Sequence, residues 1–343
     1  MGSVESGFRW ADRPAPSGPR WTAGRPRATI RVMDFAEARA TFCTPRTGPV
    51  ADPAAAATPA RRLRDALEPL AMVTVWSEPA ADRAAAAGLD FLAGYVGGRA
   101  SALGDVPGTL VASTFAVFEP DLAGGLWDRA RASCSVAQLQ QGRERAGTEA
   151  LRAALADVGE SGVDEVDVDG VVDTLRAGLA AADLMGRPLF AGMWALPWPD
   201  EAYGRLWHAT SLLREHRGDS HVAACVAAGL DGIEANVLTE LWVGFDLLEY
   251  TSTRGWSPEA MDAAIGRLRT RGLLDGPPDH TVLSDEGRRL RAGIEDATDL
   301  AQQPIVDLIG DALDRTVDAL ATWSEAVVTR GWFPPDPYKR AAG

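Results

Sequence analysis

The chain has 343 residues, of which 46% are hydrophobic and 24% are charged, and its formal net charge is −14 at pH 7. This composition is typical of a globular protein, and it excludes binding to nucleic acid or an anionic membrane through overall charge. The length predicts two folded domains, preceded by a disordered extension over residues 1–32, which are rich in Pro, Arg, Gly and Ser. Three scattered cysteines and the lack of an apolar run of ~18 residues predict a cytoplasmic protein without a membrane span.

Residues 33–230 are predicted to form a helical domain. Amphipathic patterns predict helices over residues 61–68, 80–88, 91–99, 136–155 and 171–184. Residues 110–118 are apolar throughout, so they fit either a helix or a buried strand. A helix over residues 201–217 is expected to end at Gly218, and Asp219 or Ser220 is expected to begin another helix that reaches Gly229.

Residues 231–328 are predicted to form a second domain, followed by a tail over residues 329–343. Helices are expected over residues 231–243, 245–253 and 257–274, then a strand over residues 280–283 and a further helix from Ser284. This order, with RLRTRGLL at residues 267–274 and LSDEGRRLRAGIEDATD at residues 283–299, resembles a winged helix-turn-helix of the multiple-antibiotic-resistance regulator (MarR) type. The resemblance implies a mainly α fold, in which a helical N-terminal domain packs on a MarR-like winged helix with a small β-wing.

The predicted winged helix has the wrong charge for DNA. Residues 231–299 contain 14 Asp and Glu against 7 Arg and no Lys, and the first turn of the third helix carries two carboxylates and no base-reading cation. Because each phosphate contact needs a cation, we expect a packing or dimerisation module rather than a DNA reader. The alternative is a MarR-like, ligand-responsive transcriptional regulator. An apolar stripe over residues 304–328 predicts one long helix, placed by analogy where it would form a homodimer.

The segment around residues 207–222 has the densest set of chemically active side chains. Three of the four histidines, His208, His216 and His221, lie within 14 residues. Six ionisable groups crowd into residues 214–221: Arg214, Glu215, His216, Arg217, Asp219 and His221. A polar cluster between apolar helices is typical of a buried functional site.

Three interpretations of this cluster stay open. His216 and His221 could bind a metal ion only if the helix broke at Gly218, so no metal residue is assigned. A histidine–carboxylate pair could act as a general base while an arginine holds an anionic substrate. The cluster could also be a purely structural ion-pair network. The predicted catalytic residues are His216, Glu215, Asp219 and His221, and the predicted ligand-binding residues are Arg99, Arg214, Arg217, Trp207 and His208. The expected ligand is a small polar or anionic molecule, and the sequence does not determine whether a cofactor is bound.

Several motifs together resemble an actinobacterial family described only as helix-turn-helix family proteins. The motifs are LEP at residues 67–69, GYVGGRASALG at 94–104, TFAVF at 114–118, REHRGDSHVA at 214–223 and RGW at 254–256. The resemblance spans residues 59–325. It indicates which proteins are related to this chain, but it implies no particular reaction or ligand. This chain departs from the family pattern at Ala71, where the family has a histidine, and at residues 236–240, which lack a second one. If those histidines complete a site, the activity of this chain is changed or lost.

Overall fold

The computed structural model describes residues 34–43, 58–156, 158 and 167–335. All of them belong to one compact unit, Val32–Gly343. The extension predicted for residues 1–32 and the last part of the predicted tail, from residue 336, lie outside the described residues.

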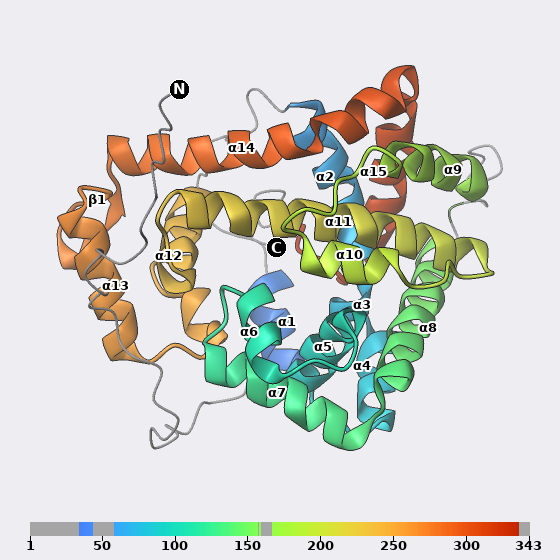
Figure 1. Ribbon diagram of the computed structural model, residues 1–343, viewed down its shortest axis with the longest axis horizontal. Coiled ribbons are helices and arrows are strands. Elements are labelled where there is room, and N and C mark those ends of the chain that lie inside the picture. The colour runs from blue at the N-terminus through green and yellow to red at the C-terminus, as the bar shows by residue number, and fades with distance from the viewer. Residues whose placement is uncertain (1–33, 44–57, 157, 159–166, 336–343) are drawn as a thin grey trace, which may run out of the picture. The chain divides into compact units, whose positions relative to one another are not determined.

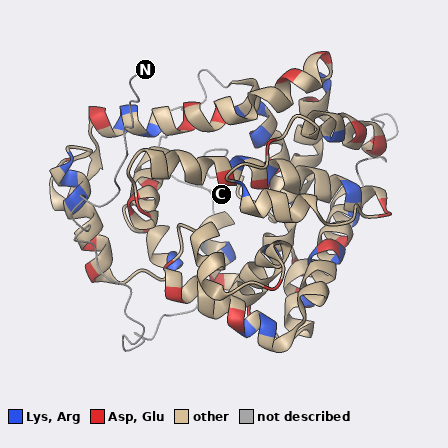
Figure 2. Ribbon diagram, viewed as in Figure 1, with Lys and Arg blue, Asp and Glu red and all other residues tan. Residues whose placement is uncertain are grey.

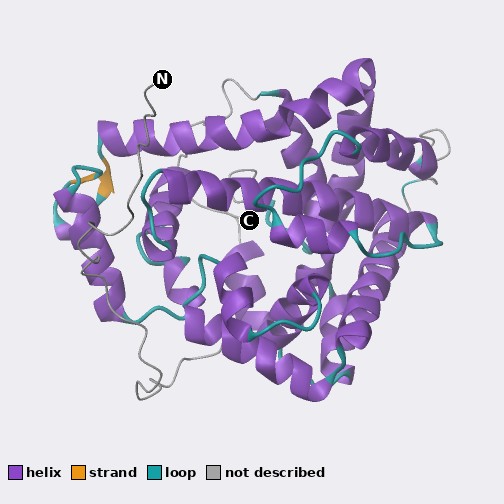
Figure 3. Ribbon diagram, viewed as in Figure 1, coloured by secondary structure: helices purple, strands orange, loops and turns teal. Residues whose placement is uncertain are grey.

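The described part is mainly helical, and its strands form a single two-stranded sheet (Figure 3). The first helices are α1 (Phe35–Cys43), α2 (Pro59–Ala71), α3 (Val73–Trp76), α4 (Glu78–Ala86), α5 (Phe91–Ala100), α6 (Gly108–Thr114), α7 (Pro120–Ser133) and α8 (Val136–Leu155). They are followed by α9 (Val168–Leu179), α10 (Pro188–Trp194), α11 (Ala202–Ala227), α12 (Gly232–Val243), α13 (Pro258–Thr270), α14 (Asp285–Ile309) and α15 (Leu313–Thr329). Strands β1 (Leu274–Asp275) and β2 (Val282–Leu283) pair antiparallel. The ambiguous apolar stretch 110–118 is therefore helical in its first half.

Helix α11 is the centre of the structure, and α2, α8, α9, α10 and α14 all pack against it (Figure 1). Leu206, Leu212 and Leu213 of α11 belong to the main apolar core. That core also contains Leu151 of α8 and Leu175 of α9. The buried polar side chains of α11, among them Glu215, His216 and Asp219, therefore lie in contacts with these neighbouring helices.

The predicted helix end at Gly218 is wrong, because α11 continues through this residue to Ala227. The expected cap of a new helix, Asp219, instead accepts a hydrogen bond of 2.9 Å from the backbone N–H of Phe190, in the first turn of α10. The side chain thus satisfies an unpaired amide at the start of a different helix. Its residue type indicated capping, but only the packing decides which helix is capped.

Gly218→Ala is expected to raise the free energy of unfolding by about 0.5–1 kcal/mol, because glycine is a poor residue inside a helix. A Cβ atom at this position would meet only Arg99 Nη2, at 3.8 Å, which is an ordinary contact. Urea unfolding monitored by circular dichroism would measure the change. If Gly218 were instead a left-handed helix cap, alanine at this position would destabilise the protein. A lower free energy of unfolding in Gly218→Ala would therefore disprove the continuous helix.

Three of the helix starts predicted in the second half are confirmed by their caps. Asp231 and Glu234 form a capping box at α12, and the side chains of Ser257 and Ser284 cap α13 and α14. The same region contains the two-stranded sheet, between α13 and α14 (Figure 1).

The helix predicted over residues 245–253 is absent, and only a short 3₁₀ turn, Thr251–Arg254, occurs there. The buried carboxylate of Glu240 accepts hydrogen bonds from the backbone N–H groups of Leu248 and Thr251, at 3.0 and 2.6 Å, and also from that of Tyr250. These amides would donate to carbonyl groups in a helix. Leu248 also adopts a φ of 71°, in the left-handed region, which an α-helix cannot contain.

The single helix predicted over residues 304–328 is also wrong. Helix α14 ends at Ile309, a 3₁₀ turn covers Gly310–Ala312, and α15 follows. The apolar stripe of α15 is buried against α2, where Ser324 also donates a hydrogen bond to the carbonyl of Ala66. The stripe therefore belongs to the protein's own core, and the homodimer stays a prediction.

In the described part of the chain, no single helix is both long enough and apolar enough to cross a membrane. Only α11 and α12 taken together, bent by 107° at the break between them, satisfy both criteria.

Candidate functional site

One face of α11 lines a cavity of about 140 Å³ between α5, the end of α6, α12 and the 3₁₀ turn Thr251–Arg254. Arg214, Gly218 and His221 of α11 lie in its wall, at the spacing that brings residues to one side of a continuous helix. We call it the aromatic cavity, because its lining includes Phe42, Trp76, Tyr95, Phe115, Phe118 and Tyr250.

Four arginines with largely buried guanidiniums lie at this site. Three of them line the aromatic cavity, and the fourth lies where α8 contacts α11. Arg99 donates to both carboxylate oxygens of Glu215, with distances of 3.0 Å from Nε to Oε1 and 2.7 Å from Nη2 to Oε2. Arg214 donates through Nε to Glu68 at 2.8 Å. Arg143 reaches Glu215 only at 3.4 Å. We call Arg99, Arg143, Arg214 and Arg254 the arginine cluster.

The carboxylate of Glu215 is held ionised by the neighbouring arginines. Burial raises the pKa of Glu215, but the guanidiniums of Arg99, Arg214 and Arg143 outweigh it and lower that pKa to about 2. Burial likewise raises the pKa of the Tyr95 hydroxyl, and the nearby arginines bring the net pKa below its ordinary value. The neighbouring arginines therefore outweigh burial in setting the pKa of both Glu215 and Tyr95.

Arg254 is the cation that lacks an opposite charge. Its guanidinium lies 4.2 Å from the ring centre of Tyr250 and 4.5 Å from that of Phe118. Within the described ranges no carboxylate lies within 4 Å of it, and its buried Nε atom has no hydrogen-bond partner. The pKa of Arg254 is lowered to about 10, mainly by burial and in part by repulsion from Arg99 and Arg214.

In the part of the chain that the structure describes, the arginine cluster thus has four guanidiniums against the carboxylates of Glu68 and Glu215. The next carboxylate along α11 is Asp219, whose pKa is raised to about 6 by burial. Even when Asp219 is counted as ionised, a positive charge remains in excess. An uncompensated buried charge is expensive, so an excess of this sign favours an anion at the site.

A second set of charges lies between α11, α2 and α14, and it is balanced among the described residues. Arg217 pairs with Glu295 at 2.9 Å and with Asp299 at 2.8 Å, and Arg291 also pairs with Glu295. Among the described residues the set contains four arginines and four carboxylates: Arg61, Arg64, Arg217, Arg291, Asp65, Glu295, Asp296 and Asp299. This network joins α11 to α2 and α14, and Arg217 belongs to it rather than to the cavity.

The four residues predicted to be catalytic do not converge. Glu215 pairs with arginines, and Asp219 caps α10. His216 is buried against Phe190 and lies 2.7 Å from Gln302, and burial lowers its pKa to about 4. His221 lines the aromatic cavity, where burial lowers its pKa to about 3.

The metal hypothesis has no geometric basis in the described part of the chain. The continuous α11 places His216 and His221 on different faces. In the ranges that the structure describes, no group of three or more His, Cys, Asp or Glu side chains could hold a metal ion.

Trp207 and His208 lie in the contact between α8 and α11, away from the wall of the aromatic cavity. Trp207 packs against Gly147, and the guanidinium of Arg143 lies 5.3 Å from its ring centre. His208 packs edge-on against Trp198, and burial lowers its pKa to about 4. Of the predicted ligand-binding residues, Arg99 and Arg214 reach the cavity.

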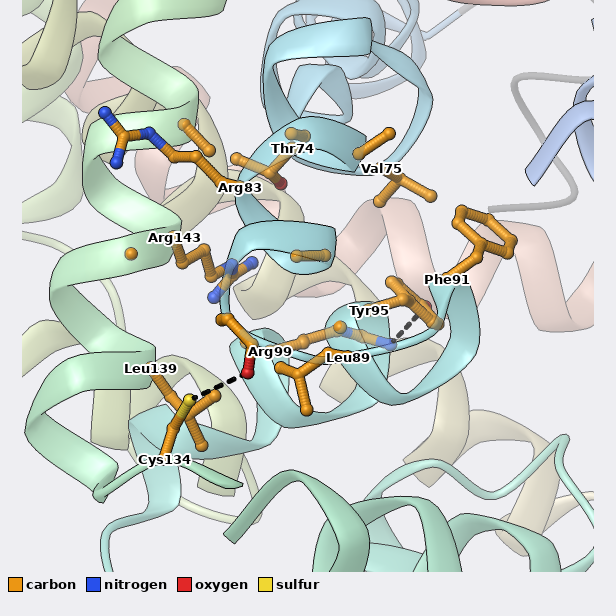
Figure 4. Close-up of a pocket in the computed structure, with 18 of the residues that line it drawn as sticks. Thr74, Val75, Arg83, Leu89, Phe91, Tyr95, Arg99, Cys134, Leu139 and Arg143 are labelled. Carbon is orange, nitrogen blue, oxygen red and sulfur yellow. Dashed lines mark hydrogen bonds between the residues drawn. The ribbon is translucent and has the colours of Figure 1, made fainter. Parts of the chain in front are cut away.

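A further cavity of about 100 Å³ lies between α4, α5 and α8 (Figure 4). It shares Met72, Tyr95, Arg99 and Arg214 with the aromatic cavity. We call it the alanine cavity, because its lining includes Ala71, Ala80, Ala81, Ala84, Ala87 and Ala146. The arginine cluster therefore has a cavity on each side.

Sequence reasoning missed three residues of the site: Tyr95, Arg143 and Arg254. Tyr95 and Arg254 lie in the motifs GYVGGRASALG and RGW, so the resemblance contained a signal for them. The departures from the family pattern also fall at cavities. Ala71 lines the alanine cavity, and Asn236 lines the aromatic cavity.

The model of the helix-turn-helix family matches residues 60–334. The chain belongs to this family. The match begins in α2 and ends after α15, so it contains the arginine cluster and both cavities. No curated protein and no solved structure matches the chain.

Proposed function

We propose that this protein binds a small anionic molecule with an aromatic or apolar body in the aromatic cavity. The observation that carries the proposal is Arg254, a cation in the cavity wall without a carboxylate partner among the described residues. The anionic group would receive charge-assisted hydrogen bonds from Arg254, which are stronger than bonds between neutral groups. The rings of Phe115, Phe118 and Tyr250 would contact the body of the ligand.

The neighbouring residues have supporting roles in this proposal. Glu215 and Glu68 hold Arg99 and Arg214 in place, so these two cations lie at the cavity with fixed orientations. His221 is neutral at pH 7 and offers a polar contact from α11. No reaction is proposed, because Glu215, His216 and Asp219, three of the expected catalytic residues, do not line the cavity.

Arg254→Met is expected to weaken binding of benzenesulfonate about tenfold, because a charge-assisted contact is lost. Binding of benzenesulfonamide, which has the same ring and a neutral polar group, should stay unchanged. Isothermal titration calorimetry measures both affinities. Arg289→Met serves as the control, since Arg289 is an exposed residue of α14. If the two compounds lose affinity equally in Arg254→Met, the cation does not recognise the anionic group and the proposal fails.

A ligand-responsive transcriptional regulator with a MarR-like winged helix is the second candidate. Its support is membership of the helix-turn-helix family and the order of α12, α13, the β1–β2 hairpin and α14. Its weakness is charge, because the start of α13 has Glu259 and Asp262, and its arginines lie at the opposite end (Figure 2). A gel shift at low salt, on the DNA upstream of the protein's gene, should give no complex. A sequence-specific shift would favour the regulator instead.

We also propose that the protein comes from an actinobacterium, lies in the cytoplasm and forms a homodimer. The composition supports the first two, with 33 arginines to one lysine and few cysteines. Size measurement in solution would test the third.

A further inference from the structure

We infer that the alanine cavity is a second binding site, which takes a small carboxylate with an unbranched or flat apolar body. The carboxylate would bind Arg143, and the apolar body would lie between α4 and α8. This site is additional to the proposed function, since it uses a different cation and a different cavity.

The alanine cavity is polar at its inner end and apolar along its walls. Arg143 of α8 and Arg99 of α5 project into the same space, as Figure 4 shows. The walls are formed by small side chains and by Leu89, Phe91 and Leu139. One charged end and one apolar body is the shape of a carboxylate with a hydrocarbon chain or ring.

The cavity exists because small residues face one another there. A Cβ on Gly94 would lie 2.7 Å from the Cβ of Ala84, so α4 and α5 are in close contact on one side. A Cβ on Gly142 would meet no atom within 4 Å, although Gly142 is part of the lining. The space beside Gly142 is therefore open, between helices that are otherwise tightly packed.

Arg143 has hydrogen-bonding capacity left for a ligand. Its side chain is only 12% exposed, and its one carboxylate neighbour in the described ranges is Glu215, at 3.4 Å. Glu215 already accepts three shorter bonds from Arg99, at 2.7, 3.0 and 3.1 Å. A guanidinium has five N–H donors, so a carboxylate entering the cavity can bind Arg143 without displacing Glu215.

Access to the cavity is from the surface beside Cys134. Ala87 and Gln138 are exposed parts of its lining, and half-buried Cys134 lies between them, with Sγ 3.9 Å from the carbonyl oxygen of Ala87. An apolar cavity of about 150 Å³ accepts benzene, so one of about 100 Å³ selects a small ligand. A molecule bound in the alanine cavity would cover the side of the Cys134 thiol that faces the cavity.

The inference is tested by the rate at which N-ethylmaleimide alkylates Cys134, followed by peptide mass spectrometry. Saturating hexanoate is expected to slow this reaction at least about fivefold, and hexanamide, its neutral counterpart, to have no effect. Alkylation of Cys43 in the same samples is the internal control. No slowing by hexanoate, or equal slowing by both compounds, would overturn the inference.

Two variants show where hexanoate binds. Arg143→Met should remove the protection, and Gly142→Leu should remove it by filling the open space while Arg143 stays in place. Arg254→Met should keep the protection in full, so failure of this inference is distinct from failure of the proposed function. Protection that survives in both Arg143→Met and Gly142→Leu would place hexanoate elsewhere and refute the second site.

Discussion

Glu215→Gln is expected to lower the free energy of unfolding by about 3–5 kcal/mol, which is the usual cost of breaking a buried ion pair from one side. The Glu215 side chain is 1% exposed, and its carboxylate is shared by Arg99 and Arg143. Without it, Glu68 would be the only paired carboxylate left for the arginine cluster. Urea unfolding would measure the loss.

Glu149→Gln is the matched control for this experiment. Glu149 also pairs with an arginine, Arg83, but its side chain is 42% exposed. Exposed ion pairs contribute only about 0–1 kcal/mol, so this variant should unfold almost like the wild type. Equal losses in the two variants would show that the arginine cluster is not held by Glu215.

The contribution of Glu215 should also depend on pH. Burial raises its pKa and the guanidiniums lower it, with a net value of about 2, against the ordinary value of 4.5 expected in the unfolded chain. Because the folded pKa is the lower one, the stabilisation is complete above about pH 4.5 and disappears as the pH falls towards 2. The stability difference between wild type and Glu215→Gln should therefore shrink in acid, and a difference that grows on acidification would contradict the ion pairing.

Gly147→Ala is expected to lower the free energy of unfolding by about 1–3 kcal/mol, the usual cost of overpacking a core. A Cβ at this position would lie 2.4 Å from Cγ of Trp207, whose ring fills the contact between α8 and α11. Trp207 is 3% exposed, so the ring cannot move aside into solvent.

A glycine of the same helix provides the control. Gly142→Ala meets no atom within 4 Å and should stabilise the protein by about 0.5–1 kcal/mol. The affinity for benzenesulfonate should be the same in Gly147→Ala and in the wild type, because Trp207 packs the helices and lies outside the aromatic cavity. A changed affinity would restore Trp207 to the ligand-binding residues predicted from the sequence.

The helices that could be predicted from the sequence are those whose starts are determined by residues close by in the chain. The helix starts at Asp231, Ser257 and Ser284 are determined by local caps, so these starts could be predicted correctly. Asp219 and Glu240 are different, because their carboxylates bind amides of another helix or of a distant turn. A sequence pattern indicates that a carboxylate will satisfy an amide, but not which one.

The candidate site was found only in part for the same reason. The segment 214–221 was recognised from its density of charges, yet its arginines divide between two networks, one with Glu68 and Glu215 and the other with Glu295 and Asp299. The partner of Glu215 is Arg99, which is 116 residues away. The RGW motif contains Arg254 but gives no reason for its role, which comes from the absence of a carboxylate among the described residues around it.

The central claim is that the arginine cluster holds an excess of positive charge that attracts an anion to the aromatic cavity. Crystals soaked in sodium bromide would test it directly, through the anomalous scattering of bromide. We expect a bromide peak inside the aromatic cavity, in contact with the guanidinium of Arg254. Bromide at exposed arginines such as Arg289, with none in the cavity, would contradict the claim.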